Sequence, residues 1–418
     1  MPLCLVDNAF PDVDDGLARV DLDLSDGRIA AIHPAGTVPP PPGAEIIDQD
    51  GGQVWPGFVD LHTHLDKGHI WPRAENPDGT FEGAITAACA DRDANWSAED
   101  VARRFEFGLR CAYAHGTVAI RTHIDSPPPQ HRISWPVFRE LRTGWAGRIA
   151  LQAASLNLPE DMCGPFGEEI ADLVAESGGV LGLVTVMCPD LDQVLDRVFA
   201  LATERNLGLD FHVDETHDPA AASLRRIAEA ALRNRFTRRI LCGHCCSLAQ
   251  QEARSVETTL DLVAQAGISV VSLPMCNLYL QDRMPGRTPR WRGVTLLHEM
   301  AARGIPVALA SDNCRDPFFA YGDHDMLEVW REAVRIAHLD RPIGAWPAAV
   351  ARTPAAIMGL PDAGIIRAGA PADLVLFRAR HHGELLSRPE SSRIVVRGGV
   401  RIDAKPPDYR ELDPLFET

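Results

Sequence analysis

The sequence predicts an α/β protein, a (β/α)8 TIM barrel with a small β-sandwich built from both chain termini. Two observations favour the barrel: eight apolar runs alternate with amphipathic helical stretches, and polar residues follow several of these runs. A third observation predicts the accessory part, because both ends of the chain consist of short β patterns separated by turn signals. The 418 residues are enough for this arrangement.

Eight apolar runs have the length and composition of buried parallel strands. Helical patterns separate them, and two of these, at 257–267 and 295–304, end at a glycine, a residue that often follows a helix. A doubly wound open sheet is the alternative. It would place a glycine-rich phosphate loop after its first strand, where this chain has HTHLDK. The runs are VWPGFVDL, GTVAIRTH, RIALQAASL, VLGLVTVM, GLDFHV, RRILCGH, ISVVSL and IPVALASD.

The terminal segments, residues 1–55 and 362–418, are expected to form one small sandwich, since each alone is too short to bury a core. In the first, ARVDLDLSDGRIAAIHPAG is typical of two strands joined by an Asp-Gly turn. In the second, GAPADLVLF precedes RIVVRGGVRI, a hairpin pattern about Gly398-Gly399. The catalytic barrel would then span residues 56–361.

Composition limits the classes of partner. The net charge of −17 argues against nucleic acid and anionic membranes, and it leaves a small-molecule substrate open. No apolar run is long enough for a spanning helix. The N-terminal stretch carries acids where a secretory signal carries bases, so we expect a cytoplasmic protein with its ten cysteines reduced. A homo-oligomer is compatible with the sequence.

Titratable residues end several of the predicted strands, and in a barrel these ends form the active-site face. His62 and His64 are two residues apart on the first strand, so their side chains point to the same side and can share one ion. A His-x-His pair alone is a weak signal, and the matching position of the other groups is what favours a metal site. The others are His123 after strand two, His212, Asp214 and Glu215 after strand five, His244 after strand six and Asp312 after strand eight.

Imidazoles with a single carboxylate suit one Zn²⁺ or Fe²⁺ ion that keeps an open position for water. A site for a hard cation would need several oxygen ligands instead. We therefore expect one divalent metal ion, zinc or iron, as the cofactor. The remaining histidines are interpreted as surface or packing residues; among them are His69, His115, His131, His217, His298, His324 and His338.

The chain resembles the amidohydrolase superfamily, and most closely its cytosine deaminase branch, over essentially its whole length. The motifs that carry this resemblance are modest one by one, and their order and spacing make them specific. The terminal segments also match the small sandwich of that superfamily. The motifs are GFVDLHTHLD, PDGTFEGAI, RTHID, FHVDE, CGH, LYLQDRMPGRTPRWRG, SDNCRDPF, GAPADLVLF and VVRGGVRI.

The resemblance implies a ligand set and a metal number. Many superfamily members bridge two metals with a carboxylated lysine at the end of strand four. Here strand four, VLGLVTVMCPD, has no lysine, and the only lysines of the chain are Lys67 and Lys405. A single metal ion is therefore expected. Its implied ligands are His62, His64, His212 and Asp312.

The resemblance also implies the catalytic groups. Asp312 would accept a proton from the attacking water, and His244 would hydrogen-bond the attacking oxygen. Glu215, three residues after His212, would act as proton shuttle to a ring nitrogen and then to the departing amine. The expected reaction is hydrolytic deamination of a cytosine-like or related nitrogen heterocycle.

The residues implied to bind substrate depart from the cytosine deaminase pattern. The glutamine that follows strand three in that branch is replaced by Ser155 or Leu156, and either Gln152 or Asn157 could substitute for it. An aspartate pair of the branch is here Asp312-Asn313, and an amide can donate as well as accept.

Three further side chains are candidates for substrate contacts. Phe318 falls where the branch has a large aromatic residue against the substrate ring, with core packing as the alternative. Lys67 could contact a substrate oxygen, or pair with Asp66 or another acid. Gln281, in the strand-seven loop, is the third candidate.

Three functions remain open at this point. The first is the heterocycle deaminase, an aminohydrolase that releases ammonia. The second is another amidohydrolase, acting on a substituted aminotriazine or a cyclic amide. The third is a catalytically silent barrel that only binds a ligand or partner, which the intact ligand set disfavours.

Overall fold

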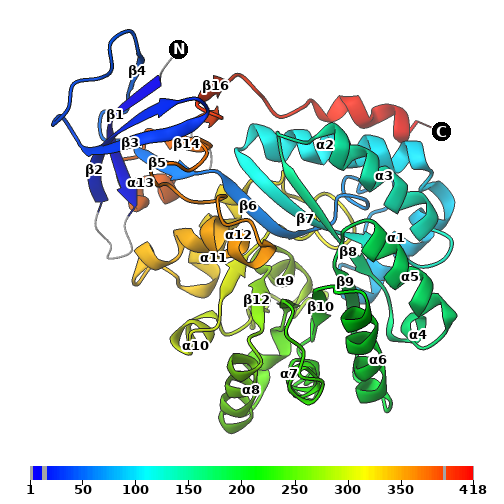
Figure 1. Cartoon of the computed structure of the whole chain (residues 1–418). Coiled ribbons are helices and arrows are strands. Elements are labelled where there is room, and N and C mark those ends of the chain that lie inside the picture. Colours follow the sequence, from blue (N-terminus) through cyan, green and yellow to red (C-terminus); the bar gives the residue numbers. More distant parts are fainter. Residues whose placement is uncertain (1–2, 12–16, 389–391, 418) are drawn as a thin grey trace.

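The computed structural model describes residues 3–11, 17–388 and 392–417 (Figure 1). All eight runs predicted as buried strands form parallel strands, each followed by helix. Nearly every residue in them is buried, which explains the near-continuous apolar composition of the runs. These strands are β6 (Phe58–Thr63), β7 (Thr117–Asp125), β8 (Ala150–Leu156), β9 (Leu181–Thr185), β10 (Leu209–Val213), β11 (Ile240–His244), β12 (Ser269–Ser272) and β13 (Val307–Leu309).

The eight strands form two parallel sheets, in the order β6-β7-β8 and β13-β12-β11-β10-β9. Isolated parallel bridges join the sheets at both edges, between Ala154 and Val180 and between Thr63 and Asp312. This α/β arrangement is consistent with the predicted barrel. It places the carboxyl ends of all eight strands at one face.

Helices connect and cover the strands, as the amphipathic patterns predict (Figure 1). Gly267 and Gly304 follow α8 and α10 with φ of +64° and +72°, a conformation that glycine adopts without steric cost. The α-helices are α1 (Phe81–Asn95), α2 (Ala98–Ala114), α3 (His131–Gly144), α4 (Pro159–Met162), α5 (Pro165–Glu176), α6 (Leu191–Glu204), α7 (Ser223–Arg233), α8 (Ala253–Gln265), α9 (Pro274–Leu280), α10 (Leu297–Ala302), α11 (Met326–Ala337), α12 (Arg352–Met358) and α13 (His382–Ser387). The 3-10 helices are η1 (Cys246–Gln250), η2 (Ile343–Ala345), η3 (Pro347–Val350) and η4 (Tyr409–Leu415).

Strands from both termini join one further sheet, with the order β16-β15-β14-β5-β1-β2-β3 and β4 paired to β1. Figure 1 shows the strands of both terminal segments together at one end of the molecule. The two predicted hairpins are present, with Asp26-Gly27 and Gly398-Gly399 at positive φ in their turns. The two-layer sandwich remains a prediction. The strands are β1 (Leu3–Pro11), β2 (Leu17–Ser25), β3 (Arg28–Pro34), β4 (Glu45–Asp48), β5 (Gln53–Pro56), β14 (Leu374–Phe377), β15 (Arg393–Arg397) and β16 (Val400–Ile402).

Aromatic packing connects this sheet to the barrel. Trp55, on β5, is fully buried, and its ring centroid lies 5.1 Å from that of Trp330 on α11 and 6.3 Å from that of Phe377 on β14. Its indole N–H donates to Gln53 Oε1 at 3.0 Å, so its only polar atom is satisfied. Trp55 therefore stabilises the junction between the terminal sheet and the barrel.

We expect Trp55→Ala to lower the free energy of unfolding by about 3–5 kcal/mol, because it opens a large cavity and removes these ring contacts. The midpoint of chemical denaturation measures the effect. Val400→Ala is the control, since Val400 is 65% exposed and its truncation should change stability by less than about 0.5 kcal/mol. Similar midpoints for the two variants would contradict the role given to Trp55.

Two further predictions from composition can be compared with the described residues. Within the described ranges, no helix has both the length and the apolar character needed to cross a bilayer. All ten cysteines are free thiols, as predicted.

Candidate active site

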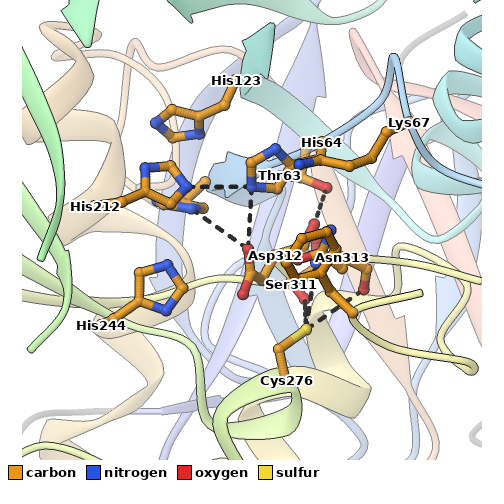
Figure 2. Close-up of polar contacts among 12 residues, drawn as sticks. Thr63, His64, Lys67, His123, His212, His244, Cys276, Ser311, Asp312 and Asn313 are labelled. Atoms are coloured by element: carbon orange, nitrogen blue, oxygen red, sulfur yellow. Dashed lines mark hydrogen bonds and ion pairs between the residues drawn. The ribbon is translucent and has the colours of Figure 1, made fainter. Parts of the chain in front are cut away.

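Four histidines from the ends of three strands meet at the carboxyl face of the barrel. His62 and His64 come from β6, His123 from β7 and His212 from β10, and one ring nitrogen from each lies within 4.8 Å of the others. Asp312 lies beyond β13, and one of its carboxylate oxygens is within 4.8 Å of a ring nitrogen of His62, so this carboxylate completes the group. Figure 2 shows the side chains of His64, His212 and Asp312 pointing toward a common centre. Every one of them is at least 90% buried.

The distances within this group are those of ligands around one small ion. His64 Nε2 lies 3.3 Å from His212 Nε2, and Asp312 Oδ1 lies 3.3 Å from His64 Nε2 and 3.4 Å from His62 Nε2. A tetrahedral ion bound at about 2.1 Å separates its ligand atoms by about 3.4 Å. Both carboxylate oxygens of Asp312 and Nε2 of His62 are also buried without a hydrogen-bond partner. The four residues therefore fit a zinc-type ion.

The charge states of these groups also suit metal binding. Burial lowers the pKa of His62, His64 and His212 well below 6.5, so their imidazoles are neutral. Burial opposes the charge on Asp312, yet His244 and His62 hold the pKa of that carboxyl below its usual value. Neutral imidazole and ionised carboxylate are the forms that bind a cation.

The backbone beyond β13 differs from the expected strand. The strand was expected to run to Asp312, but it ends at Leu309, and Asp312 adopts a φ of +61°. Asp312 N donates to His62 O at 2.9 Å, and Thr63 Oγ1 donates to Asp312 O at 2.8 Å. These bonds hold a strained conformation in place, and the conformation aims the carboxylate at the histidines.

Glu215 and His244 lie beside the histidine group and beside each other. Glu215 follows β10, His244 ends β11, and Glu215 Oε1 is 3.4 Å from His244 Nδ1. Asn277, on α9, joins them: its amide nitrogen donates to Glu215 Oε1 at 3.1 Å and lies 3.0 Å from His244 Nδ1. Asn277 was not among the site residues predicted from the sequence. No motif distinguishes it, because its role depends on contacts across the barrel.

We expect Asn277→Leu to lower kcat about 10- to 100-fold with little change in KM, because it removes the bond that orients the Glu215 carboxylate but no contact to substrate. Steady-state kinetics measure both constants. Asn277→Asp, which keeps the size of the side chain but adds a carboxylate beside Glu215, should be impaired as well. An unchanged kcat in Asn277→Leu would contradict this role.

His123 was noted at the end of strand two but was not assigned to the site. Its ring centroid lies 4.0 Å from that of His62, and its Nε2 lies 3.1 Å from Asp210 Oδ1 on β10. Arg121 donates to the other oxygen of Asp210 at 3.0 Å. His123 is thus held by a buried acid and packs beneath a metal-ligand candidate. Its position at the end of a predicted strand was the sequence signal that could have assigned His123 to the site.

Lys67 pairs with an acid, one of the two alternatives expected for it. Its Nζ lies 3.3 Å from Asp125 Oδ1 and 4.8 Å from the centroid of the Phe318 ring. Burial opposes its charge, yet Asp125, Asp316 and Asp66 raise the pKa of Lys67. In Figure 2 its side chain reaches toward the histidine group. Lys67 thus places a positive charge next to an aromatic face at the edge of the site.

The two predicted amide contacts are engaged within the protein. Gln281 Nε2 donates to Glu215 O at 3.1 Å, and Asn313 Nδ2 donates to Asp316 Oδ2 at 2.6 Å. Each amide retains its oxygen for another partner. Both side chains are nevertheless close to the catalytic candidates, since Gln281 contacts Glu215 and Asn313 follows Asp312.

The candidates for the missing glutamine are also engaged. Gln152 accepts from Arg121 and donates to Met358 O at 2.9 Å. Asn157 donates to Ser126 O at 3.2 Å, and the Ser155 hydroxyl accepts from Gly182 N at 2.9 Å. Gln152 therefore contributes to the barrel interior through both ends of its amide.

Known proteins are similar to this chain over most of its length. A model described as "Amidohydrolase family" matches residues 168–403. The chain is 57% identical over 406 residues to a pterin deaminase of Rhizobium rhizogenes, covering 96% of this chain and 92% of the relative. It is 23% identical over 349 residues to an N-isopropylammelide isopropyl amidohydrolase of Pseudomonas sp., covering 80% and 81% of the two chains.

Solved structures give the same fold. The chain matches the crystal structure of a 5-methylcytosine deaminase from Klebsiella pneumoniae liganded with 5-fluorocytosine, with a TM-score of 0.84 and 24% identity. The match covers 97% of this chain and 98% of that one.

Proposed function

The chain belongs to the amidohydrolase family, and on that premise we propose that it is a metal-dependent aminohydrolase that removes an amino group from a pterin-type heterocycle and releases ammonia. It is a hydrolase that acts on carbon–nitrogen bonds. The observation that carries the substrate is the 57% identity to a pterin deaminase over 406 residues. A pterin contains an amino-oxopyrimidine ring, so it is one of the nitrogen heterocycles expected from the sequence. The proposal thus narrows the substrate class from nitrogen heterocycles in general to pterins.

In this proposal residues 56–361 form the catalytic barrel, and residues 1–55 with 362–418 form an accessory sandwich. Every candidate site residue lies in the first of these. The metal ligands are His62, His64, His212 and Asp312. Three pairs of their buried ligand atoms, His64–His212, His64–Asp312 and His62–Asp312, lie 3.3–3.4 Å apart. Zinc and iron both suit three imidazoles and one carboxylate. The bound ion would supply Lewis acidity that makes a water nucleophilic near neutral pH.

The chain's own groups then move the protons. Asp312 accepts the proton that the attacking water loses, since one of its oxygens remains beside the reacting centre. Glu215 donates its proton to the ring nitrogen next to the attacked carbon, regains a proton from the added hydroxyl group as the carbonyl forms, and transfers it to the departing amino group. Asp312 then returns its proton to Glu215, so both groups regain their starting states. His244 hydrogen-bonds the attacking oxygen as charge develops on it. Water and the amino heterocycle thus become an oxo heterocycle and ammonia.

Four side chains are proposed to position the substrate. Lys67 supplies a cation for a ring oxygen, and the Phe318 ring beside it offers a flat apolar face to the heterocycle. Gln281 and Asn313 each retain an amide oxygen that can accept from ring N–H groups. A bicyclic ring would extend from the metal toward the Lys67 side of the site.

A substrate comparison tests the proposal. The metal-loaded protein is assayed for ammonia with pterin, cytosine and an N-alkylated aminotriazine, and the triazine reaction is also assayed for free amine. We expect kcat/KM for pterin to exceed that for cytosine at least about 100-fold, because binding energy from the second ring is used in the transition state. Faster turnover of cytosine, or amine release from the triazine alone, would overturn the substrate assignment.

A further inference from the structure

A second group of metal-ligand side chains lies outside the proposed catalytic centre. His69 follows β6, and Cys314 and His324 lie between β13 and α11. One ring nitrogen of each histidine and the thiol of Cys314 lie within 4.8 Å of one another. The segments are fixed to each other, since His69 N donates to Cys314 O at 3.0 Å. We refer to these three residues as the His-Cys-His cluster.

The cluster contains buried polar atoms without a partner. His69 and His324 are only 1% and 2% exposed, and Cys314 is 1% exposed. Neither ring nitrogen of His69 has a hydrogen-bond partner, and Nε2 of His324 has none. Leaving an imidazole unsatisfied in the interior costs free energy, so such atoms require an explanation. A bound cation would satisfy one ring nitrogen of each histidine.

The helix that covers the cluster leaves room beside it. Gly108 lies in the interior of α2, where glycine costs about 1 kcal/mol relative to alanine. A Cβ at this position would lie 3.0 Å from His324 Nε2, the nitrogen that has no partner, and 2.7 Å from Leu65 Cδ2. The glycine therefore keeps open the space next to the free nitrogen.

Charged side chains of both signs act on the cluster. Asp323 adjoins His324 in the chain, and it acts electrostatically on both histidines and on Cys314. Burial, together with Asp325 and Asp323, raises the pKa of Glu328 to about 7. His115 pairs with Asp323 at 2.7 Å, and Arg393 pairs with Asp325 at 2.5 Å. Arg104 and Arg315 act on His69 in the opposite sense, so the ligand geometry and the unpartnered nitrogens, rather than net charge, support a cation here.

We propose that the His-Cys-His cluster binds a second divalent ion of the zinc type. Nitrogen and sulfur ligands select zinc over magnesium or calcium, and three protein ligands leave one tetrahedral position for water. The Cys314 thiol loses its proton to solvent as its sulfur coordinates the ion, so the thiolate offsets one of the two positive charges. Zinc separates such ligand atoms by about 3.4–3.7 Å, and the three atoms lie within 4.8 Å of one another, so binding would shorten any of these separations by at most about 1.4 Å.

This ion would support the catalytic centre without touching substrate. His324 Nδ1 lies 3.5 Å from Thr63 Oγ1, and Thr63 stands between two of the proposed catalytic ligands. Cys314 is two residues beyond Asp312 in the same loop. The second ion would therefore fix the loop after β13 to the loop after β6.

Cobalt substitution tests the proposal on the full chain, because only the second site contains sulfur. The protein is stripped with a chelator, reloaded with Co²⁺ and examined for the near-ultraviolet thiolate-to-cobalt charge-transfer band, with metal content measured in parallel. We expect the band and a second ion per chain in the unmodified protein. Cys314→Ser and His69→Gln should each lose the band and that ion, and Cys111→Ser, at a neighbouring buried thiol, should keep both.

The outcomes separate this site from the catalytic one. His212→Ala should lose the catalytic ion and keep the charge-transfer band, which shows that the two sites are independent. The proposal is overturned if the unmodified protein binds a single ion without the band, a measurement that needs no variant to fold. It is also overturned if the band persists in Cys314→Ser or disappears in Cys111→Ser.

Discussion

Glu215→Gln is expected to lower kcat about 10²- to 10⁴-fold while the protein keeps its metal, which is the usual range for loss of a positioned acid–base group. The glutamine oxygen can still accept from Asn277, so the local packing is retained. Only the ability to transfer a proton is lost. Ammonia release under saturating substrate and metal content of the same sample measure the two parts of this prediction.

A matched control for this variant is Glu252→Gln, since Glu252 is exposed at the start of α8 and its side chain makes no capping hydrogen bond. It should keep full activity, because it makes the same chemical change far from the site. Turnover by Glu215→Gln at the rate of this control would show that another group carries the proton. Loss of metal in Glu215→Gln would instead show that Glu215 acts on the ligands.

The strands and the candidate ligands were predictable because both follow local rules. Parallel strands covered by helices are buried on both faces, so they appear in the sequence as apolar runs whose ends are easily located. The carboxyl ends of such strands meet at one face. His62, His64 and His212 could therefore be predicted to converge without knowledge of the helices between them. The Asp-Gly and Gly-Gly turns were predictable because few other residues accept their positive φ.

The partners of these residues were not predictable in the same way. Asn277 contacts Glu215 and His244 through tertiary structure alone, and although it directly precedes the LYLQDR motif, no pattern in the sequence indicates this role. His69 and His324 were interpreted as surface or packing residues, and their burial agrees with packing; the sequence did not indicate that both lie within reach of the Cys314 thiol. Their separation of 255 positions in the chain hides that proximity. Local patterns thus predict which side chains face the site, and tertiary contacts decide what each one does.

Removing the His212 imidazole should lower activity as strongly as removing the proton shuttle Glu215, but through loss of the metal ion. We expect His212→Ala to lose the proposed catalytic ion and to lower kcat/KM by more than about 100-fold, because even indirect partners of a ligand cost 10- to 100-fold. His212 Nε2 lies 3.3 Å from His64 Nε2, so its removal leaves a gap on one side of the ligand group. Metal content and ammonia release measure the effect.

The control for this variant is His217→Ala, since His217 is exposed and only five residues from His212. It should bind metal and turn over substrate normally. If His212→Ala keeps both its ion and its activity, the four buried side chains do not act as one ligand set. If it keeps the ion but loses turnover, His212 acts on substrate instead. The ligand distances explain the site only if His212→Ala loses both metal content and turnover, because the ion that these imidazoles hold is the one that makes water reactive.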